Sequence, residues 1–245
     1  MALSTKNAKD IGTPWVHFFL YGDTGSGKTK AASTFPRPLF LVPQNENSIT
    51  TLRGQDVPYY EIIDMSSPVA DGIGGMIAVL DEIERAYDKG PEEFPFDTIV
   101  IESISHYADL CIEEMSKGNA LQMDQQKWGR LGSHFRNLQT RLRKLDCHVV
   151  FTALAKASVI ADAEDGGGQA PGAPLIQGQT ALKLPSACDV IGYCEEYRAN
   201  AKDLEYRVHF RKYRHFPARS RFSRMPAVVK NFDFKKVEAF LKPDV

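Results

Sequence analysis

The chain has 245 residues, of which 43% are hydrophobic and 25% are charged, and its net charge is −1. This is enough apolar material for one large domain, but no run reaches the roughly 18 apolar residues of a membrane span. The polar first ten residues lack the apolar stretch of a signal peptide, and the four cysteines form no C-x-x-C pair. We therefore expect a soluble, cytoplasmic protein with reduced thiols and no membrane partner.

The first strong motif is GDTGSGKT at 22–29, which follows an apolar run from Trp15 to Tyr21. It matches the phosphate-binding pattern G-x-x-x-x-G-K-[ST], with a predicted strand before it and a helix-compatible segment, 29–34, after it. Backbone N–H groups of such a loop surround a phosphate, and the following helix adds the positive end of its dipole. We predict that Lys28 contacts the phosphates of ATP and that Thr29 ligates Mg²⁺. The predicted nucleotide-binding residues are Gly22, Asp23, Thr24, Gly25, Ser26, Gly27, Lys28 and Thr29.

Predicted strands and helices alternate through the first 156 residues, after a flexible lead-in at 1–13. Strands are predicted at 39–42, 58–62, 98–101 and 149–153. Helices are predicted at 73–87, after Ser103, and around 128–142, where apolar residues recur every three or four positions. This alternation predicts an α/β domain with a mainly parallel central sheet flanked by helices. Such a sheet binds ligands at the carboxyl ends of its strands, where the phosphate loop, 44–46, Glu102 and 154–156 would all lie.

The second half of the chain is less regular. A Gly-Gly-Gly run and two prolines within 157–180 predict a mobile loop at 157–177. Strands are predicted near 190–197 and 206–213, and a short helix at 234–241. The segment 205–230 holds eight Lys/Arg against one Glu, a charge of +7 that leaves −8 for the rest of the chain. This asymmetry indicates an anionic partner.

The order of these motifs resembles the compact RecA-like P-loop ATPases encoded by phages, some of which are single-strand annealing recombinases. The segments that carry the resemblance are GDTGSGKT at 22–29, TIVIES at 98–103, VVFTALAK at 149–156, GQTALKLPSACDV at 178–190 and RVHFRKYR at 207–214. The resemblance implies one RecA-like ATPase domain, 14–245, that binds ATP, Mg²⁺ and single-stranded DNA in recombination or strand annealing. It also implies a ring or filament of identical subunits in a bacterial host's cytoplasm, with a single-strand binding protein as a further candidate partner.

The resemblance assigns roles to residues at three strand ends. Glu102 stands where the family has an Asp that holds the magnesium shell. Gln44 aligns best with the catalytic Glu of the family, and Glu46 is the alternative base that could reach the attacking water. Leu154 replaces the sensor glutamine, for which Thr152 or Lys156 could substitute.

The resemblance also implies two roles for basic residues in the segment 205–230. Lys212 and Arg214 resemble the cationic pair that a RecA-like subunit extends into the nucleotide site of its neighbour, which makes turnover depend on assembly. The loop at 157–177 and the stretch 117–126 correspond in position to the two DNA loops of the family. Arginines interleaved with phenylalanines are typical of single-stranded DNA sites. The predicted DNA-binding residues are Arg207 and Arg211, on one face of a predicted strand, and Arg219, Arg221 and Arg224.

Two other functions remain open on the sequence alone. A monomeric P-loop kinase or phosphotransferase could use 157–177 as a lid over its acceptor. An ATP-gated scaffold that does not hydrolyse ATP would account for the changes at Gln44 and Leu154.

Overall fold

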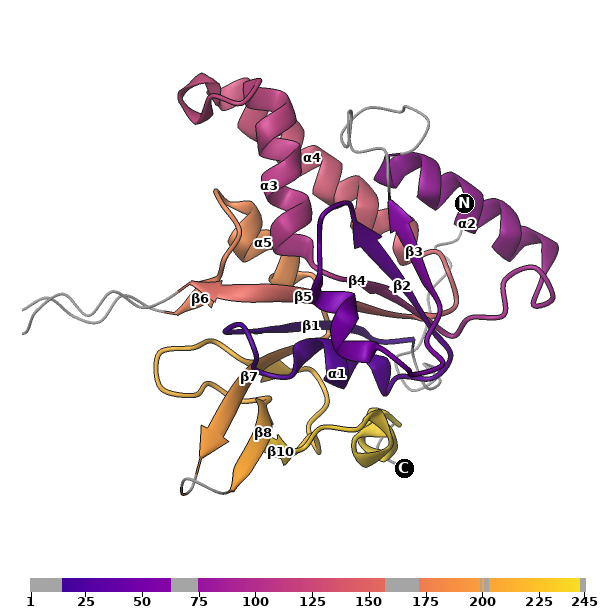
Figure 1. Cartoon of the computed structure of the whole chain (residues 1–245), viewed down its shortest axis with the longest axis vertical. Coiled ribbons are helices and arrows are strands. Elements are labelled where there is room, and N and C mark those ends of the chain that lie inside the picture. Colours follow the sequence, from indigo (N-terminus) through magenta and orange to yellow (C-terminus); the bar gives the residue numbers. More distant parts are fainter. Residues whose placement is uncertain (1–14, 63–74, 157–171, 199, 201–202, 243–245) are drawn as a thin grey trace, which may run out of the picture.

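A mostly parallel sheet with helices on both faces forms the centre of the fold, as the computed structural model shows for residues 15–62, 75–156, 172–198, 200 and 203–242 (Figure 1). The strand order is β10-β8-β7-β1-β5-β4-β2-β3. The strands are β1 (His17–Gly22), β2 (Pro38–Pro43), β3 (Tyr59–Ile62), β4 (Thr98–Ile101), β5 (His148–Lys156), β7 (Val190–Arg198), β8 (Leu204–His209) and β10 (Val228–Lys230). Two short strands, β6 (Ala173–Pro174) and β9 (Arg219–Ser220), pair antiparallel with β5 and β7.

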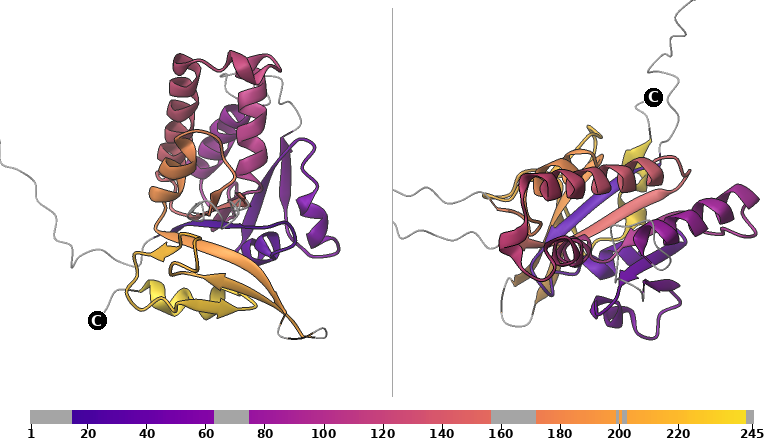
Figure 2. Two further views of the ribbon diagram at one scale, coloured as in Figure 1. Left: turned by 90° about the vertical axis from the view of Figure 1, so that its left-hand side faces the viewer. Right: turned by 90° about the horizontal axis from the view of Figure 1, so that it is seen from above.

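The helices divide between the two faces of the sheet. One face carries α1 (Lys28–Ser33) and three 3₁₀ turns, η2 (Ser48–Leu52), η5 (Phe234–Lys236) and η6 (Glu238–Leu241). The other face carries α2 (Met76–Lys89), α3 (Ile104–Ser116), α4 (Gln125–Leu142) and α5 (Thr180–Ser186). Figure 2 shows α3 and α4 projecting together away from the sheet, with the 3₁₀ turn η3 (Ala120–Gln122) in the connection between them. In the described part of the chain, no helix combines the length and the apolar character that crossing a bilayer requires.

The central strand β1 explains why both faces are covered. All six of its residues are buried, and successive side chains of a strand point to opposite faces. Phe18 and Leu20 therefore pack with α1, while Phe19 and Tyr21 pack with α3 and α4. This two-sided burial, together with the parallel pairing of β1 with β5 and β7, of β2 with β3 and β4, and of β4 with β5, confirms the predicted α/β fold with a mainly parallel sheet.

The C-terminal residues belong to the core on the α1 face. The ring of Phe234 lies 4.6 Å from that of Phe35 and 6.5 Å from that of Phe18, measured between centroids. Phe35 also stacks on Phe232 at 6.0 Å, and Val237 is fully buried. This aromatic cluster attaches η5 and η6 to the helix that follows the phosphate loop.

Several predicted boundaries were wrong for identifiable reasons. The strand predicted at 206–213 ends at His209, because the chain turns back on itself where Tyr213 pairs with Phe216. The helix predicted at 234–241 consists of two 3₁₀ turns, and residues 173–174 of the predicted 157–177 loop form β6. Helix α5 was not predicted, since Pro185 near its end acts as a breaker signal. The lead-in at 1–13 and residues 157–171 of the predicted loop lie outside the described residues.

Candidate functional site

The phosphate loop connects β1 to α1, and its glycines are required by its geometry. A Cβ at Gly22 would lie 2.1 Å from the carbonyl oxygen of Cys194 and 2.7 Å from Ser26 Oγ, so no larger residue fits. Gly25 and Gly27 have φ angles of 79° and 83°, in the left-handed region that favours glycine. The backbone thus favours glycine at three positions of the loop, of which the sequence pattern specifies two, Gly22 and Gly27.

Lys28 begins α1, and its side chain lies within the phosphate loop. It is only 7% exposed, and its Nζ donates to the carbonyl oxygens of Gly22 at 3.0 Å and Asp23 at 2.7 Å. Burial lowers the pKa of Lys28, while the carboxylates of Glu102, Asp23 and Glu46 oppose this shift. The loop therefore holds a buried cation surrounded by oxygen atoms.

Glu102 follows the end of β4 and meets the loop through Thr29. The Thr29 Oγ1 donates to Glu102 Oε1 at 3.1 Å, and Glu102 is 2% exposed. Its Oε2 is buried without a hydrogen-bonding partner among the described residues. Burial raises the pKa of Glu102 to about 7, against the opposing effects of the two threonine hydroxyls and of Lys28. This carboxylate has an unsatisfied oxygen that a cation would satisfy.

The pair Thr29 and Glu102 fits a magnesium ion. Mg²⁺ prefers oxygen ligands, and it usually takes one or two from the protein while phosphates and water supply the rest. In the described segments, no group of three or more His, Cys, Asp or Glu could hold a metal ion. A hydroxyl and a carboxylate with one buried, unpaired oxygen are sufficient for that role.

Glu46 reaches this cluster through hydrogen bonds of its carboxylate. Its Oε2 accepts a hydrogen bond from Ser103 Oγ at 3.1 Å, and its Oε1 accepts one from the Ser48 amide at 3.2 Å. The carbonyl oxygen of Gln44 instead accepts from His106 Nε2 at 2.9 Å. Through Ser103, the residue after Glu102, the structure connects the carboxylate of Glu46 to the site.

Leu154 lies at the carboxyl end of β5, and its backbone groups are already paired. Its amide donates to Ser105 Oγ at 3.0 Å, and its carbonyl oxygen accepts from the Leu175 amide at 2.6 Å. Of the two residues that could substitute for a polar sensor, Thr152 is fully buried beside Glu102, whereas Lys156 is exposed at the end of the strand. Thr152 is therefore the better placed of the two.

Lys212 and Arg214 lie on a turn after β8, which we call the cation turn (residues 212–216). Both side chains are exposed, and the Arg214 guanidinium lies 5.1 Å from the centroid of the Tyr213 ring. The turn is closed by hydrogen bonds between the backbones of Tyr213 and Phe216, and the Phe216 ring stacks on Tyr193 at 3.9 Å. The cation turn thus presents two positive charges from a rigid aromatic base, and Phe216 has no free face for a nucleobase on its Tyr193 side.

The predicted DNA-binding arginines contact the protein itself. The Arg207 guanidinium pairs with Glu205 and lies 3.3 Å from the centroid of the Tyr197 ring. Arg211, which follows the end of β8 and so does not share its face, donates to backbone carbonyl oxygens, as does Arg224. The strand face predicted to present Arg207 and Arg211 together therefore does not exist.

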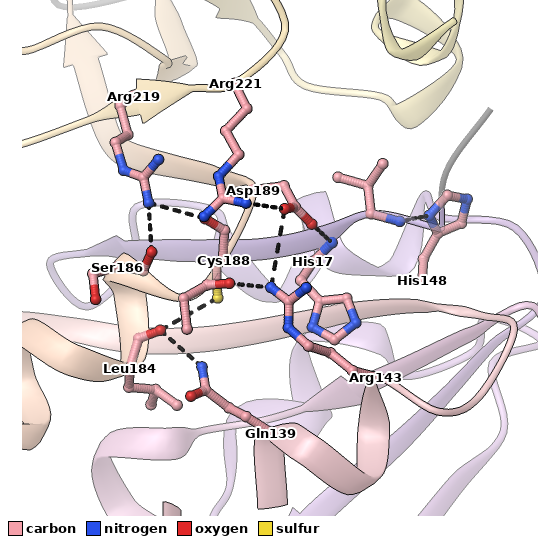
Figure 3. A network of polar contacts seen from close by, with 12 residues as sticks. His17, Gln139, Arg143, His148, Leu184, Ser186, Cys188, Asp189, Arg219 and Arg221 are labelled. Atoms are coloured by element: carbon pink, nitrogen blue, oxygen red, sulfur yellow. Dashed lines mark hydrogen bonds and ion pairs between the residues drawn. The ribbon is translucent and has the colours of Figure 1, made fainter. Parts of the chain in front are cut away.

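Arg219 and Arg221 lie at the amino end of β7, the edge of the sheet opposite the phosphate loop (Figure 3). Arg219 donates to the carbonyl oxygens of Ser186 and Cys188 at 2.7 and 3.1 Å, and Arg221 pairs with Asp189 at 3.2 Å. The guanidinium groups of all five arginines are thus engaged within the protein, and their contact with DNA stays a prediction.

The network in Figure 3 also contains a buried histidine whose titration we expect to affect stability. His17 is 3% exposed, and burial, followed by the charge on Arg143, lowers its pKa from 6.5 to about 4. Between pH 6.5 and pH 4, His17 is mostly protonated in the unfolded chain but mostly neutral in the folded chain. The free energy of unfolding should therefore fall by about 3 kcal/mol between pH 6.5 and pH 4 from this residue alone.

Urea unfolding at pH 7, 5.5 and 4 measures this effect. The variant His17→Gln, which cannot titrate, should lose less stability than the parent over the same interval. Equal losses in the two proteins would assign the acid sensitivity to other groups.

Two contacts of the site could not be anticipated. Ser105, which binds the Leu154 amide, carries no motif of its own. The ring of Tyr206 lies beside Gly27, where an added Cβ would be 3.0 Å from Tyr206 Cδ1. No local signal connects residues so far apart in the sequence, whereas Ser103 directly follows Glu102 in the segment TIVIES.

Comparison with known proteins adds one finding. A family model described as an AAA domain matches residues 16–222, a span that includes the phosphate loop, Glu46, Glu102 and the cation turn. No curated protein matches the chain.

Proposed function

Because the chain belongs to the AAA domain family of P-loop ATPases, we propose that it binds ATP with Mg²⁺ at residues 22–29 and hydrolyses it. The observation that carries this proposal is the contact between Thr29 Oγ1 and Glu102 Oε1, beside the buried ammonium group of Lys28. These three residues supply the cation and the oxygen ligands that phosphoryl transfer requires. The family match supports the nucleotide-binding part directly.

Each residue of the site has a proposed task. Lys28 binds the phosphate oxygens, and Thr29 and Glu102 would hold Mg²⁺, which when bound neutralises charge on those oxygens. Glu46, oriented by Ser103, accepts the proton of the attacking water. The carboxylate of Glu46 can perform that step, whereas the amide of Gln44 could only orient the water.

We further propose that the ATPase is completed by assembly of identical subunits. The support is the cation turn, whose exposed Lys212 and Arg214 lie on a rigid base. A cation supplied to a neighbour's phosphate stabilises the charge of the transition state, as an arginine finger does. The resemblance to RecA-like proteins suggests a ring or a filament.

Single-stranded DNA is the partner we propose, with strand annealing or recombination as the process. The charge of +7 on 205–230 and the exposure of Lys212 and Arg214 support it. The arginines Arg211, Arg219 and Arg221 contribute less to this argument, because their guanidinium groups already have partners within the protein. Phosphate contacts would make the binding weaken steeply with salt.

The testing experiment is ATP hydrolysis by the purified protein over a concentration series, with Mg²⁺ or with EDTA, and with or without single-stranded DNA. We expect turnover that requires Mg²⁺, increases with DNA and rises more than linearly with protein concentration. Turnover that is linear in protein and indifferent to DNA would favour the monomeric phosphotransferase. ATP binding without hydrolysis under any condition would favour the ATP-gated scaffold.

A further inference from the structure

A cavity of about 270 Å³ opens beside the phosphate loop, on the side of β1 opposite β4. Ser26 and Gly27 of the loop form one wall, and Ala31 of α1 continues it. Tyr206 of β8 forms the facing wall, and residues 231–233 and 236 close the rim. The cavity is therefore continuous with the site that holds the phosphates, but it lies away from Glu102.

Tyr206 places an aromatic ring directly against the phosphate loop. A Cβ at Gly27 would lie 3.0 Å from Cδ1 and 3.2 Å from Cγ of this ring. The backbone of Tyr206 is fixed on both sides by Asn231, whose Oδ1 accepts from the Tyr206 amide at 3.1 Å and whose amide donates to the Tyr206 carbonyl oxygen at 2.5 Å. The ring is half-buried and projects from a fixed backbone, as a stacking surface requires.

The size and the lining of the cavity fit a nucleobase. Pockets for drug-sized ligands measure roughly 300–1,000 Å³, so this cavity suits one planar ring system rather than a whole nucleotide. Its walls are aromatic and aliphatic at Tyr206, Val208 and Ala31. The polar groups of the lining include the amide of Asn231, the carboxylate of Asp233 and the ammonium groups of Lys30 and Lys236. Base recognition commonly combines such a stacking face with a few polar groups at the edge of the base.

We propose that the purine base of the nucleotide bound by the phosphate loop stacks on Tyr206 in this cavity. Residues 228–236, which follow the family match, then complete the ATP site of this chain by holding Tyr206 and forming the rim. This inference rests on the proposed function of the loop, because the phosphates must lie at Lys28 for the base to reach the cavity.

Titration calorimetry with ATP and with inorganic triphosphate separates the two parts of the site. The variants Tyr206→Ala and Tyr206→Leu, of which the second keeps an apolar side chain against Gly27, should raise the Kd for ATP by about 5- to 150-fold. Their Kd for inorganic triphosphate should stay at the parent value, and Tyr206→Phe should restore ATP binding. The parent should bind ATP more tightly than CTP, and Tyr206→Ala should reduce that preference.

The matched control is Tyr197→Ala, which removes an aromatic ring from the same hairpin outside the cavity and should leave the Kd for ATP unchanged. Unfolding midpoints establish that each variant is folded. Parent-like ATP binding by both Tyr206→Ala and Tyr206→Leu would overturn the inference, as would equal losses of ATP and triphosphate or equal parent affinities for ATP and CTP. If the loop did not bind phosphates at all, Lys28→Ala would instead bind inorganic triphosphate with the Kd of the parent.

Discussion

Lys28→Ala is expected to abolish measurable ATP turnover while the chain stays folded. The Lys28 ammonium is the buried cation within the phosphate loop, where it contacts the carbonyl oxygens of Gly22 and Asp23. Removing one preorganised charge of this kind costs roughly 100- to 1,000-fold in turnover. Phosphate release under saturating Mg²⁺ and ATP measures the loss, and calorimetry measures the accompanying loss of ATP and triphosphate binding.

A matched control for this variant is Lys89→Ala, which removes an exposed lysine at the end of α2. Its turnover and its ATP affinity should equal those of the parent. Far-ultraviolet circular dichroism and the urea midpoint test whether Lys28→Ala is folded. Full ATP affinity in a folded Lys28→Ala protein would count decisively against phosphate binding by the loop.

The double variant Lys212→Ala, Arg214→Ala should lose the turnover that depends on assembly and should keep ATP binding by the single subunit. Cations donated between subunits contribute roughly 10³- to 10⁵-fold to turnover in related phosphoryl-transfer sites, so the expected effect is large. The concentration series that rises steeply for the parent should become flat. The matched control is Arg85→Ala, Lys89→Ala, which removes two exposed cations from α2.

Mixing two inactive proteins gives the sharper form of this test. A Lys28→Ala subunit keeps its cation turn, and the double variant keeps its phosphate loop. Where the first lies next to the second, one intact site forms, so the mixture should recover part of the parent turnover. Absence of recovery from proteins that still assemble, or unchanged turnover in the double variant alone, would exclude donation of these cations to a neighbour.

The sheet and the position of the phosphate loop could be predicted because their signals are local. Burial on both faces makes β1 a continuous apolar run, and the positive φ angles at Gly25 and Gly27 demand glycine whatever the rest of the fold does. The apolar period of α4 likewise follows from the one face that it buries. Each of these features is determined by fewer than twenty consecutive residues, so a sequence pattern can detect it.

The elements that escaped prediction owe their stability to distant partners. The strands β6 and β9 have two residues each and exist through pairing with β5 and β7, so no period could reveal them. The partners of the basic residues were hidden for the same reason, since Arg221 binds Asp189 across 32 positions. Charge alone therefore indicated an anionic partner, but it could not tell paired guanidinium groups from free ones.

The position of Glu46 illustrates the same limit within the site. The resemblance to RecA-like ATPases favoured Gln44, which lies directly after β2. The contact from Ser103 to Glu46 depends on β2 and β4 being neighbours in the sheet, and on the path of the turn after Pro43. Neither fact is written in the local sequence.

The aromatic cluster around Phe35 includes residues that lie beyond the end of the family match. The match ends at residue 222. Phe232 and Phe234, which cover Phe35, come after that residue. The strand β10, which pairs with the edge of β8, also comes after it. A chain cut at 222 would leave Phe18 and Phe35 facing water and would bare a strand edge, a combination that promotes aggregation. The family match therefore ends before the residues that a stable fold requires. A truncation designed for expression has to keep Phe232, Phe234 and β10.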